Sequence, residues 1–111
     1  MKIILALLTI FVATTSQAKE TVVIGLASNF SELSTVSFNP FGGYFQNAIE
    51  LAVSDNKTLL DKAEISLQLV KYDYGTNDIN VIKKAKEASS SDAIAVIGYN
   101  YSAPALLSAP I

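Results

Sequence analysis

The feature that most constrains the fold is a strict alternation of strand-like and helix-like segments. Three apolar runs, at residues 21–26, 65–72 and 93–98, predict strands, and amphipathic patterns over 45–53 and 79–88 predict helices between them. Parallel strands need a long crossover, which a helix supplies, whereas antiparallel strands need only a short turn. The alternation therefore predicts an α/β fold with a three-stranded parallel sheet of βαβαβ type.

Crossover rules predict the order of these strands. Right-handed crossovers favour the spatial order 2-1-3, which is half of a doubly wound, Rossmann-like lobe. The run TVVIGL at 21–26 is continuously apolar, as expected for a strand covered on both faces. Residues 65–72 alternate between apolar and polar side chains more than residues 21–26 do, which predicts a strand near an edge of the sheet. Such sheets bind ligands at the carboxyl ends of their strands.

Two strand-end loops stand out as candidate binding loops. The first runs from about Ala27 to Gly42 and is unusually long for a strand-to-helix connection. Its candidate binding residues are Ser28, Asn29, Phe30 and Phe41. The second follows Gly98 and leads through Asn100, Tyr101 and Ser102 into a new helical pattern. A hydroxyl and backbone N–H groups at a helix start suit an anion such as a carboxylate.

Each of these residues also has a purely structural interpretation. Ser102 could be only the N-cap of the last helix, and Tyr101 and Phe41 could cover an apolar edge. Asp73 precedes Tyr74 and Gly75, which favours a turn former over a ligand contact. The pair Gly42-Gly43 lacks the three spaced glycines of a dinucleotide site.

The first 18 residues predict a signal peptide. A basic start, an apolar run over residues 3–13 and small residues at Ser16 and Ala18 predict cleavage between Ala18 and Lys19. The apolar run is shorter than the roughly 20 residues that span a bilayer. We therefore expect residues 19–111 to be periplasmic or secreted, with no membrane span in the mature chain.

Composition excludes several kinds of site. The chain has no arginine, and its formal net charge is −2, which disfavours nucleic acid as a partner. It has no cysteine and therefore no disulfide, thiolate nucleophile or lipid-anchor cysteine. It has no histidine, which removes the usual general base and zinc ligand. We expect no enzyme activity, no metal and no cofactor.

A resemblance to a known family adds to this reading. The segments VIGLAS, FGGYFQNAIELAV, LQLVKYDYGTN and AIAVIGYNYSAPALLSAPI follow one another in order and spacing. Together they resemble the N-terminal lobe of type I periplasmic binding proteins, the leucine/isoleucine/valine-binding family of ABC importers. The resemblance implies that residues 19–111 form part of such a lobe.

The resemblance also implies a binding site. In that family a serine hydroxyl and backbone groups after the third strand hold the ligand's α-carboxylate, and Ser102 falls at that serine. Asn100 and Tyr101 fall on the preceding loop positions, and Phe41 falls where an aromatic side chain covers the ligand. The expected ligand-binding residues are Phe41, Asn100, Tyr101, Ser102 and Ala103.

The expected function is capture of a small polar metabolite, such as an amino acid, for ABC-type import. Family members close two lobes around the ligand, so the end of the helical pattern at Ile111 leads us to expect a truncated reading of a longer protein. The first loop lacks the family's Ser-Gly-Pro, so the resemblance does not identify the ligand. The alternatives are a lobe of an extracellular sensor, a small flavodoxin-like enzyme that binds phosphate, and a non-functional remnant.

Overall fold

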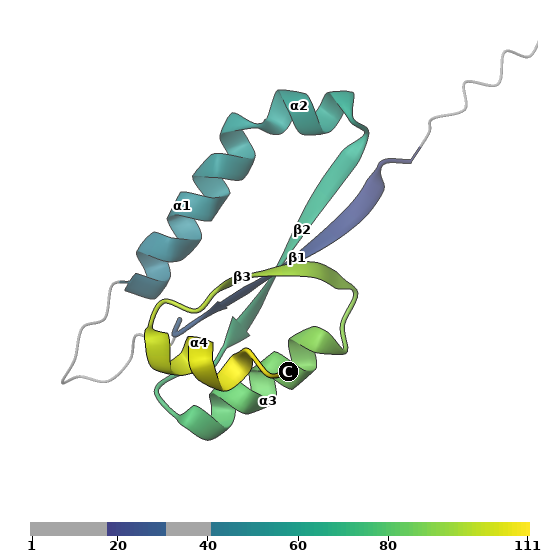
Figure 1. Cartoon of the computed structure of the whole chain (residues 1–111). Coiled ribbons are helices and arrows are strands. Elements are labelled where there is room, and N and C mark those ends of the chain that lie inside the picture. Colours follow the sequence, from purple (N-terminus) through teal and green to yellow (C-terminus); the bar gives the residue numbers. More distant parts are fainter. Residues whose placement is uncertain (1–17, 31–40) are drawn as a thin grey trace, which may run out of the picture.

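The structure is a computed structural model that describes residues 18–30 and 41–111. The expected signal peptide, apart from Ala18, and the side chain of Phe41 lie outside the described residues. Strands and helices alternate as the sequence predicts, with one additional short helix (Figure 1). In chain order they are β1 (Glu20–Ser28), α1 (Phe41–Asp55), α2 (Lys57–Lys62), β2 (Ile65–Asp73), α3 (Asp78–Ser89), β3 (Ala93–Gly98) and α4 (Ser102–Ser108).

The three strands form a parallel sheet in the order β2-β1-β3, which confirms the predicted order. Central β1 is longer than predicted, because its pairing continues past the apolar run through Ala27 and Ser28. Ser28 pairs with Asp73 of β2, and Ala27 pairs with Gly98 of β3. This register brings the carboxyl ends of the three strands to the same edge of the sheet.

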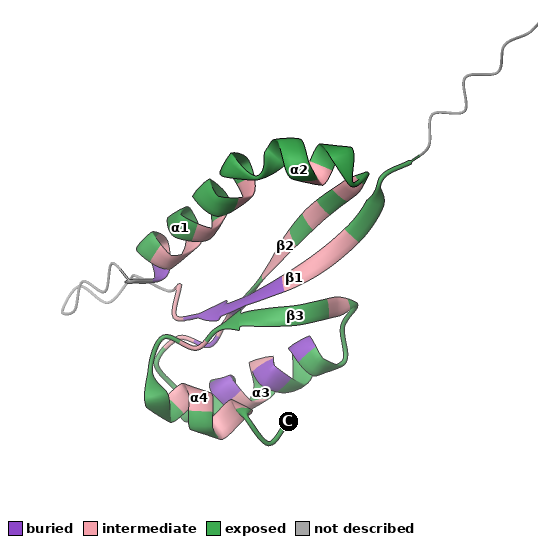
Figure 2. Ribbon diagram, turned by 45° about the horizontal axis from the view of Figure 1, so that its top comes forward, coloured by how far each residue is buried: buried purple, intermediate pink, exposed green. Residues whose placement is uncertain are grey.

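Helices lie on both sides of this sheet. Figures 1 and 2 show α1 and α2 on one side and α3 and α4 on the other. Helix α3 contacts all three strands and α4, and it supplies most of the helical core. Helix α1 lies less closely over its face and leaves a hollow of about 340 Å³. The hollow is lined by apolar groups of α1, α2, β2 and β3, among them Ile49, Val53, Leu60, Leu67 and Ile97.

The core lies between the sheet and α3. Ala27, Tyr72 and Ala88 form a buried cluster, against which Val70 and Tyr99 pack. The Tyr72 hydroxyl donates a 2.9 Å hydrogen bond to Ser91 Oγ, and Ser91 Oγ donates to the Ala88 carbonyl at 2.7 Å. The polar tip of a buried tyrosine is thereby satisfied at the end of α3.

The predicted apolar face of α3 is partly wrong. The spacing predicts a line of Ile79, Ile82, Ala85 and Ala88, but Ile79 is 74% exposed and the buried line is Val81, Ala85 and Ala88. Asn77 caps the helix by accepting from the Ile79 N–H, so Ile79 lies in the first turn. Residues 81, 85 and 88 then share one face at the i, i+4, i+7 spacing.

Helix α2 was not predicted. The first helix ends at Asp55 as expected, but the chain turns at Asn56 and forms a second helix at once. The Asn56 side chain donates 2.8 Å to the Ala52 carbonyl, which closes the end of α1. Leu60, the half-buried residue of α2, also lines the hollow under α1, so tertiary packing stabilises a six-residue helix that local sequence would not.

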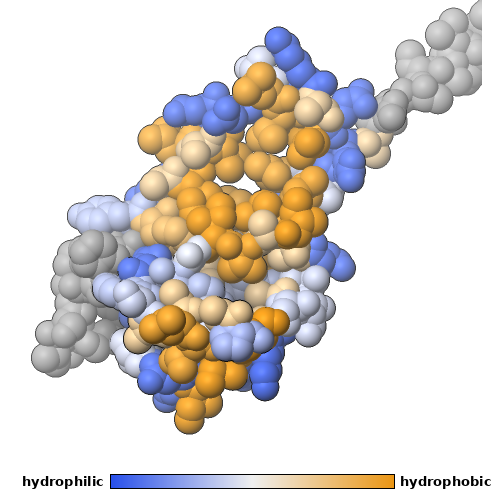
Figure 3. All heavy atoms as spheres, viewed as in Figure 1, coloured by the Kyte–Doolittle hydropathy of each residue, from blue (hydrophilic) through white to orange (hydrophobic). Residues whose placement is uncertain are grey.

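Strand β3 remains largely uncovered. Ile94 is 73% exposed, and Val96 and Ile97 also face solvent over much of their surface. Figure 3 shows apolar side chains gathered over the middle of the molecule, between the two groups of helices. Among the described strands, β3 pairs with β1 alone.

No helix in the described ranges, 18–30 and 41–111, has both the length and the apolar character needed to cross a bilayer.

We predict that Gly98→Ala strongly destabilises the lobe. A Cβ atom at residue 98 would lie 2.1 Å from the carbonyl oxygen of Ala27, a buried backbone group of the central strand. Relieving this overlap requires β3 to move, and the expected loss in the free energy of unfolding is about 2 kcal/mol or more. Urea denaturation followed by circular dichroism measures it. The exposed control Ser66→Ala should change stability by less than about 0.5 kcal/mol, and equal stabilities of the two variants would refute the prediction.

The pKa of Asp61 should be low in the folded protein. Its carboxylate accepts hydrogen bonds from Lys19 Nζ at 2.5 Å and Lys57 Nζ at 2.6 Å, which lower the pKa from 3.8 to about 2. Stabilisation from these pairs is present above the ordinary pKa and is lost as the pH falls toward 2. Side-chain carboxyl NMR titration should show this midpoint, and Lys57→Gln should raise it. A midpoint near 3.8 in the unsubstituted protein would contradict the assignment.

Candidate functional site

The carboxyl ends of β1 and β2 are joined through Asp73. One carboxylate oxygen accepts from the backbone N–H of Phe30 at 3.1 Å and from that of Gly75 at 3.0 Å. Gly75 has a φ of 57°, a conformation that glycine adopts without strain. Asp73 therefore forms the turn after β2, as predicted, and also holds Phe30, two residues after the end of β1.

The loop after β3 is tied to the same point. Asn100 Nδ2 donates a 2.8 Å hydrogen bond to Ser28 Oγ, and Ser28 is fully buried at the end of β1. The Ser28 carbonyl also accepts from the Tyr74 N–H at 3.2 Å. Side-chain and backbone hydrogen bonds thus hold the chain after β1, β2 and β3 in one cluster, and Ser28 contacts both neighbours.

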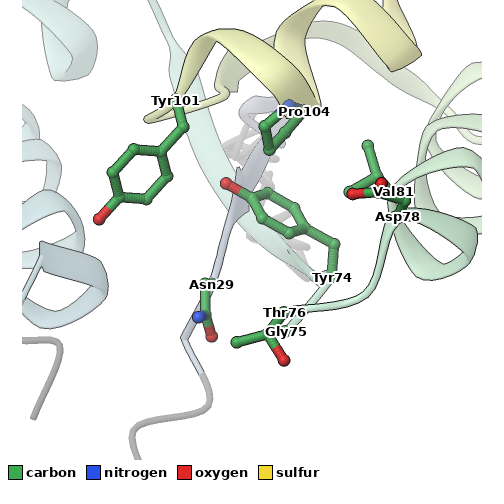
Figure 4. Close-up of a pocket in the computed structure, with 8 residues that line it drawn as sticks. All are labelled: Asn29, Tyr74, Gly75, Thr76, Asp78, Val81, Tyr101 and Pro104. Atoms are coloured by element: carbon green, nitrogen blue, oxygen red, sulfur yellow. The ribbon is translucent and has the colours of Figure 1, made fainter. Parts of the chain in front are cut away.

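A pocket of about 330 Å³ opens beside this cluster, between the turn after β2, the start of α3 and the start of α4 (Figure 4). This volume is at the lower end of the range for small-molecule sites. Its walls combine the apolar groups of Val81 and Pro104 with an aromatic ring and several polar side chains. The lining residues are Asn29, Tyr74, Gly75, Thr76, Asp78, Val81, Tyr101 and Pro104.

Tyr74 is the most deeply buried polar residue of the pocket. Its ring stacks on Tyr99 at a centroid distance of 5.7 Å, and the residue is 2% exposed. Among the described residues neither its hydroxyl nor Asn29 Oδ1 has a hydrogen-bond partner. Burial raises the pKa of the Tyr74 hydroxyl, while the nearby backbone of Asn100 acts in the opposite direction. The hydroxyl is therefore protonated at neutral pH.

The structure separates the predicted site residues. Tyr101 lines the pocket and is 46% exposed, whereas the Asn100 amide is used to hold Ser28. Ser102 and Ala103 are exposed at the start of α4, outside the lining of this pocket. The N-cap of α4 is Tyr101, so the alternative reading of Ser102 as a capping residue is wrong. The side chain of Phe41 lies outside the described residues.

Sequence reasoning missed most of the pocket walls. Tyr74, Thr76 and Asp78 come from the turn after the second strand, where only Asp73 was considered. The position of Tyr74, directly after the last residue of β2, was the signal that could have indicated this wall. A ring at that position packs near the edge of the sheet. Val81 of α3, which the predicted apolar line did not include, and Pro104 of α4 complete the walls.

The described lining of the pocket offers no positive charge to a ligand. None of its lining residues is a lysine, and Asp78 contributes a carboxylate. Lys71, near the end of β2, lies instead over the ring of Phe30 at 5.3 Å. In the described part of the chain, no group of three or more acidic side chains is placed to hold a metal ion.

The comparison with solved structures bears on the fold. A leucine-binding protein from Thermotoga maritima matches 80% of this chain with a TM-score of 0.64 at 24% sequence identity. The two share a fold. This likeness confirms the fold that the sequence resemblance implied. The match covers 24% of the other protein, so the chain spans about a quarter of its length. No protein-family model and no curated protein matches the sequence.

We predict that Ser28 and Asn100 are energetically coupled. Removing either side chain leaves the other without its partner, so Ser28→Ala and Asn100→Ala should each destabilise the protein by about 1 kcal/mol. The double variant should lose less than the sum, with a coupling of about 0.5 kcal/mol or more. A double-mutant cycle from urea denaturation measures this coupling, and strictly additive losses would contradict it.

Proposed function

We propose that this chain is a lobe of an extracytoplasmic solute-binding protein that captures a small polar metabolite for ABC-type import. The observation that carries the proposal is the fold, which it shares with a leucine-binding protein. The pocket among the strand-end loops supports it further, because doubly wound sheets bind ligands at the carboxyl ends of their strands. An amino acid is the first solute to test.

The loop after β3 is the proposed primary contact for the solute. Tyr101 would pack its exposed ring on the ligand, and the hydroxyl of Ser102 and the backbone at Ala103 would contact its carboxylate. Asn100 would position this loop through its hydrogen bond to Ser28. Phe41, at the start of α1, would cover the ligand from the first loop. These roles follow from the family resemblance.

The proposed mechanism is closure of two lobes around the solute. A ligand that binds first to this lobe and then contacts a second lobe stabilises the closed form by its higher affinity for that state. The closed protein would deliver the solute to an ABC permease in the inner membrane. A signal peptide over residues 1–18, cleaved between Ala18 and Lys19, would export the chain. The proposed role is binding rather than catalysis, as in the leucine-binding neighbour.

A solute panel tests the proposal through Tyr101. Titration calorimetry with neutral, acidic and basic amino acids should identify at least one that binds. Tyr101→Ala should weaken that binding about tenfold, because it removes an aromatic contact surface.

Leu106→Ala is the matched control, since Leu106 lies on α4, is 74% exposed and is not part of the pocket. It should bind like the unsubstituted protein. The proposed function fails if no solute of the panel binds, and the proposed site fails if both variants bind a solute equally well.

A further inference from the structure

Two buried oxygen atoms at the pocket lack hydrogen-bond partners among the described residues. They are the Tyr74 hydroxyl and Asn29 Oδ1, and both residues line the pocket. Figure 4 shows the Tyr74 ring at the centre of the group, with its hydroxyl directed toward the side on which Tyr101 and Pro104 lie. Buried polar groups are nearly always paired, so each such atom calls for a partner. Both oxygen atoms are shielded from bulk solvent, so a hydrogen bond from a group in the pocket to either of them would be stronger than in water.

The two atoms have complementary hydrogen-bonding roles. The Tyr74 hydroxyl has no hydrogen-bond partner among the described residues and can donate its proton to an acceptor. Asn29 Oδ1 is a carbonyl oxygen and can only accept. A solute that satisfies both atoms presents an acceptor to Tyr74 and a donor to Asn29. Primary amides and hydroxyl groups have both, whereas a carboxylate has no donor and an ammonium has no acceptor.

The surrounding walls disfavour an anion. Asp78 places a carboxylate at the pocket, and none of the described lining residues is a lysine. The remaining walls include Val81 and Pro104, which suit a short apolar stem. Desolvating a charged group against these walls without an opposite charge would be costly.

We propose that this pocket takes an uncharged amide or hydroxyl group of the solute, attached to a small apolar stem. The inference rests on the proposed function, that the strand-end loops bind a solute, and adds the chemical class of the part that enters here. The carboxylate of an amino acid would then lie outside this pocket, toward Ser102.

Three small probes of similar shape test the charge preference. Isobutyramide, isobutyrate and isobutylamine share a branched apolar stem and differ in their end group. Each is titrated into the isotope-labelled full chain, and binding is followed by the backbone amide signals of residues 74–78 and 101. Isobutyramide should bind most tightly, and Tyr74→Phe should weaken it roughly threefold to tenfold by removing one hydrogen bond.

The control is Tyr72→Phe, which removes a buried hydroxyl that is bonded to Ser91 away from the pocket. It should leave isobutyramide binding unchanged. Asn29→Asp should shift the preference toward isobutylamine, because it replaces the neutral acceptor by a carboxylate. Folding of each variant is checked by its amide spectrum before titration.

The inference is overturned if isobutyrate binds as tightly as isobutyramide, if no probe binds, or if Tyr74→Phe and Tyr72→Phe behave alike. The proposed function can survive each of these results, since it is decided separately by solute binding through Tyr101. If isobutyramide binds through Tyr74 but no solute of the amino-acid panel binds, the inference about the pocket stands and the proposed function fails.

Discussion

Burial of the carboxyl-terminal half of β1 is the constraint on which the rest of the structure depends. Leu26, Ala27 and Ser28 are almost completely inaccessible to solvent, and both neighbouring strands pair along this stretch. The lack of a side chain at Gly98 allows β3 to lie this close to β1, because a Cβ atom there would collide with the Ala27 carbonyl. The opposite end of the strand is open, so the lobe is held together most firmly at the edge where its loops meet. The most deeply buried residues of β1 and the candidate site therefore lie at the same edge of the sheet.

The position of the candidate site follows from that constraint. A parallel sheet directs all its carboxyl ends to one edge, and Asp73 and Ser28 join the chain segments that leave it. These side chains hold the strand-end segments to one another. The pocket is lined instead by groups one to three positions further along, such as Tyr74, Thr76 and Tyr101. The candidate site thus lies beside strand-end segments that are joined to one another by hydrogen bonds.

The sequence was sufficient for the fold, because strand order depends on alternation and crossover handedness, which are visible in TVVIGL, the helical spacing and AIAVIG. The sequence was insufficient for features that depend on tertiary packing. Helix α2 is stabilised by a neighbour rather than by its own residues, and Ile79 is exposed because the cap at Asn77 sets the phase of α3. At the site, Tyr101 lines the pocket, but the pairing of Asn100 with Ser28, 72 residues away, follows from no local pattern.

The most direct test of the account is a crystal structure of the chain with the solute that binds most tightly. The account predicts electron density for the solute at the carboxyl edge of the sheet, in contact with Tyr101, with the Ser28–Asn100 hydrogen bond intact. Density in the apolar hollow under α1, or anywhere away from the strand-end loops, would contradict the central claim that this edge is the binding surface.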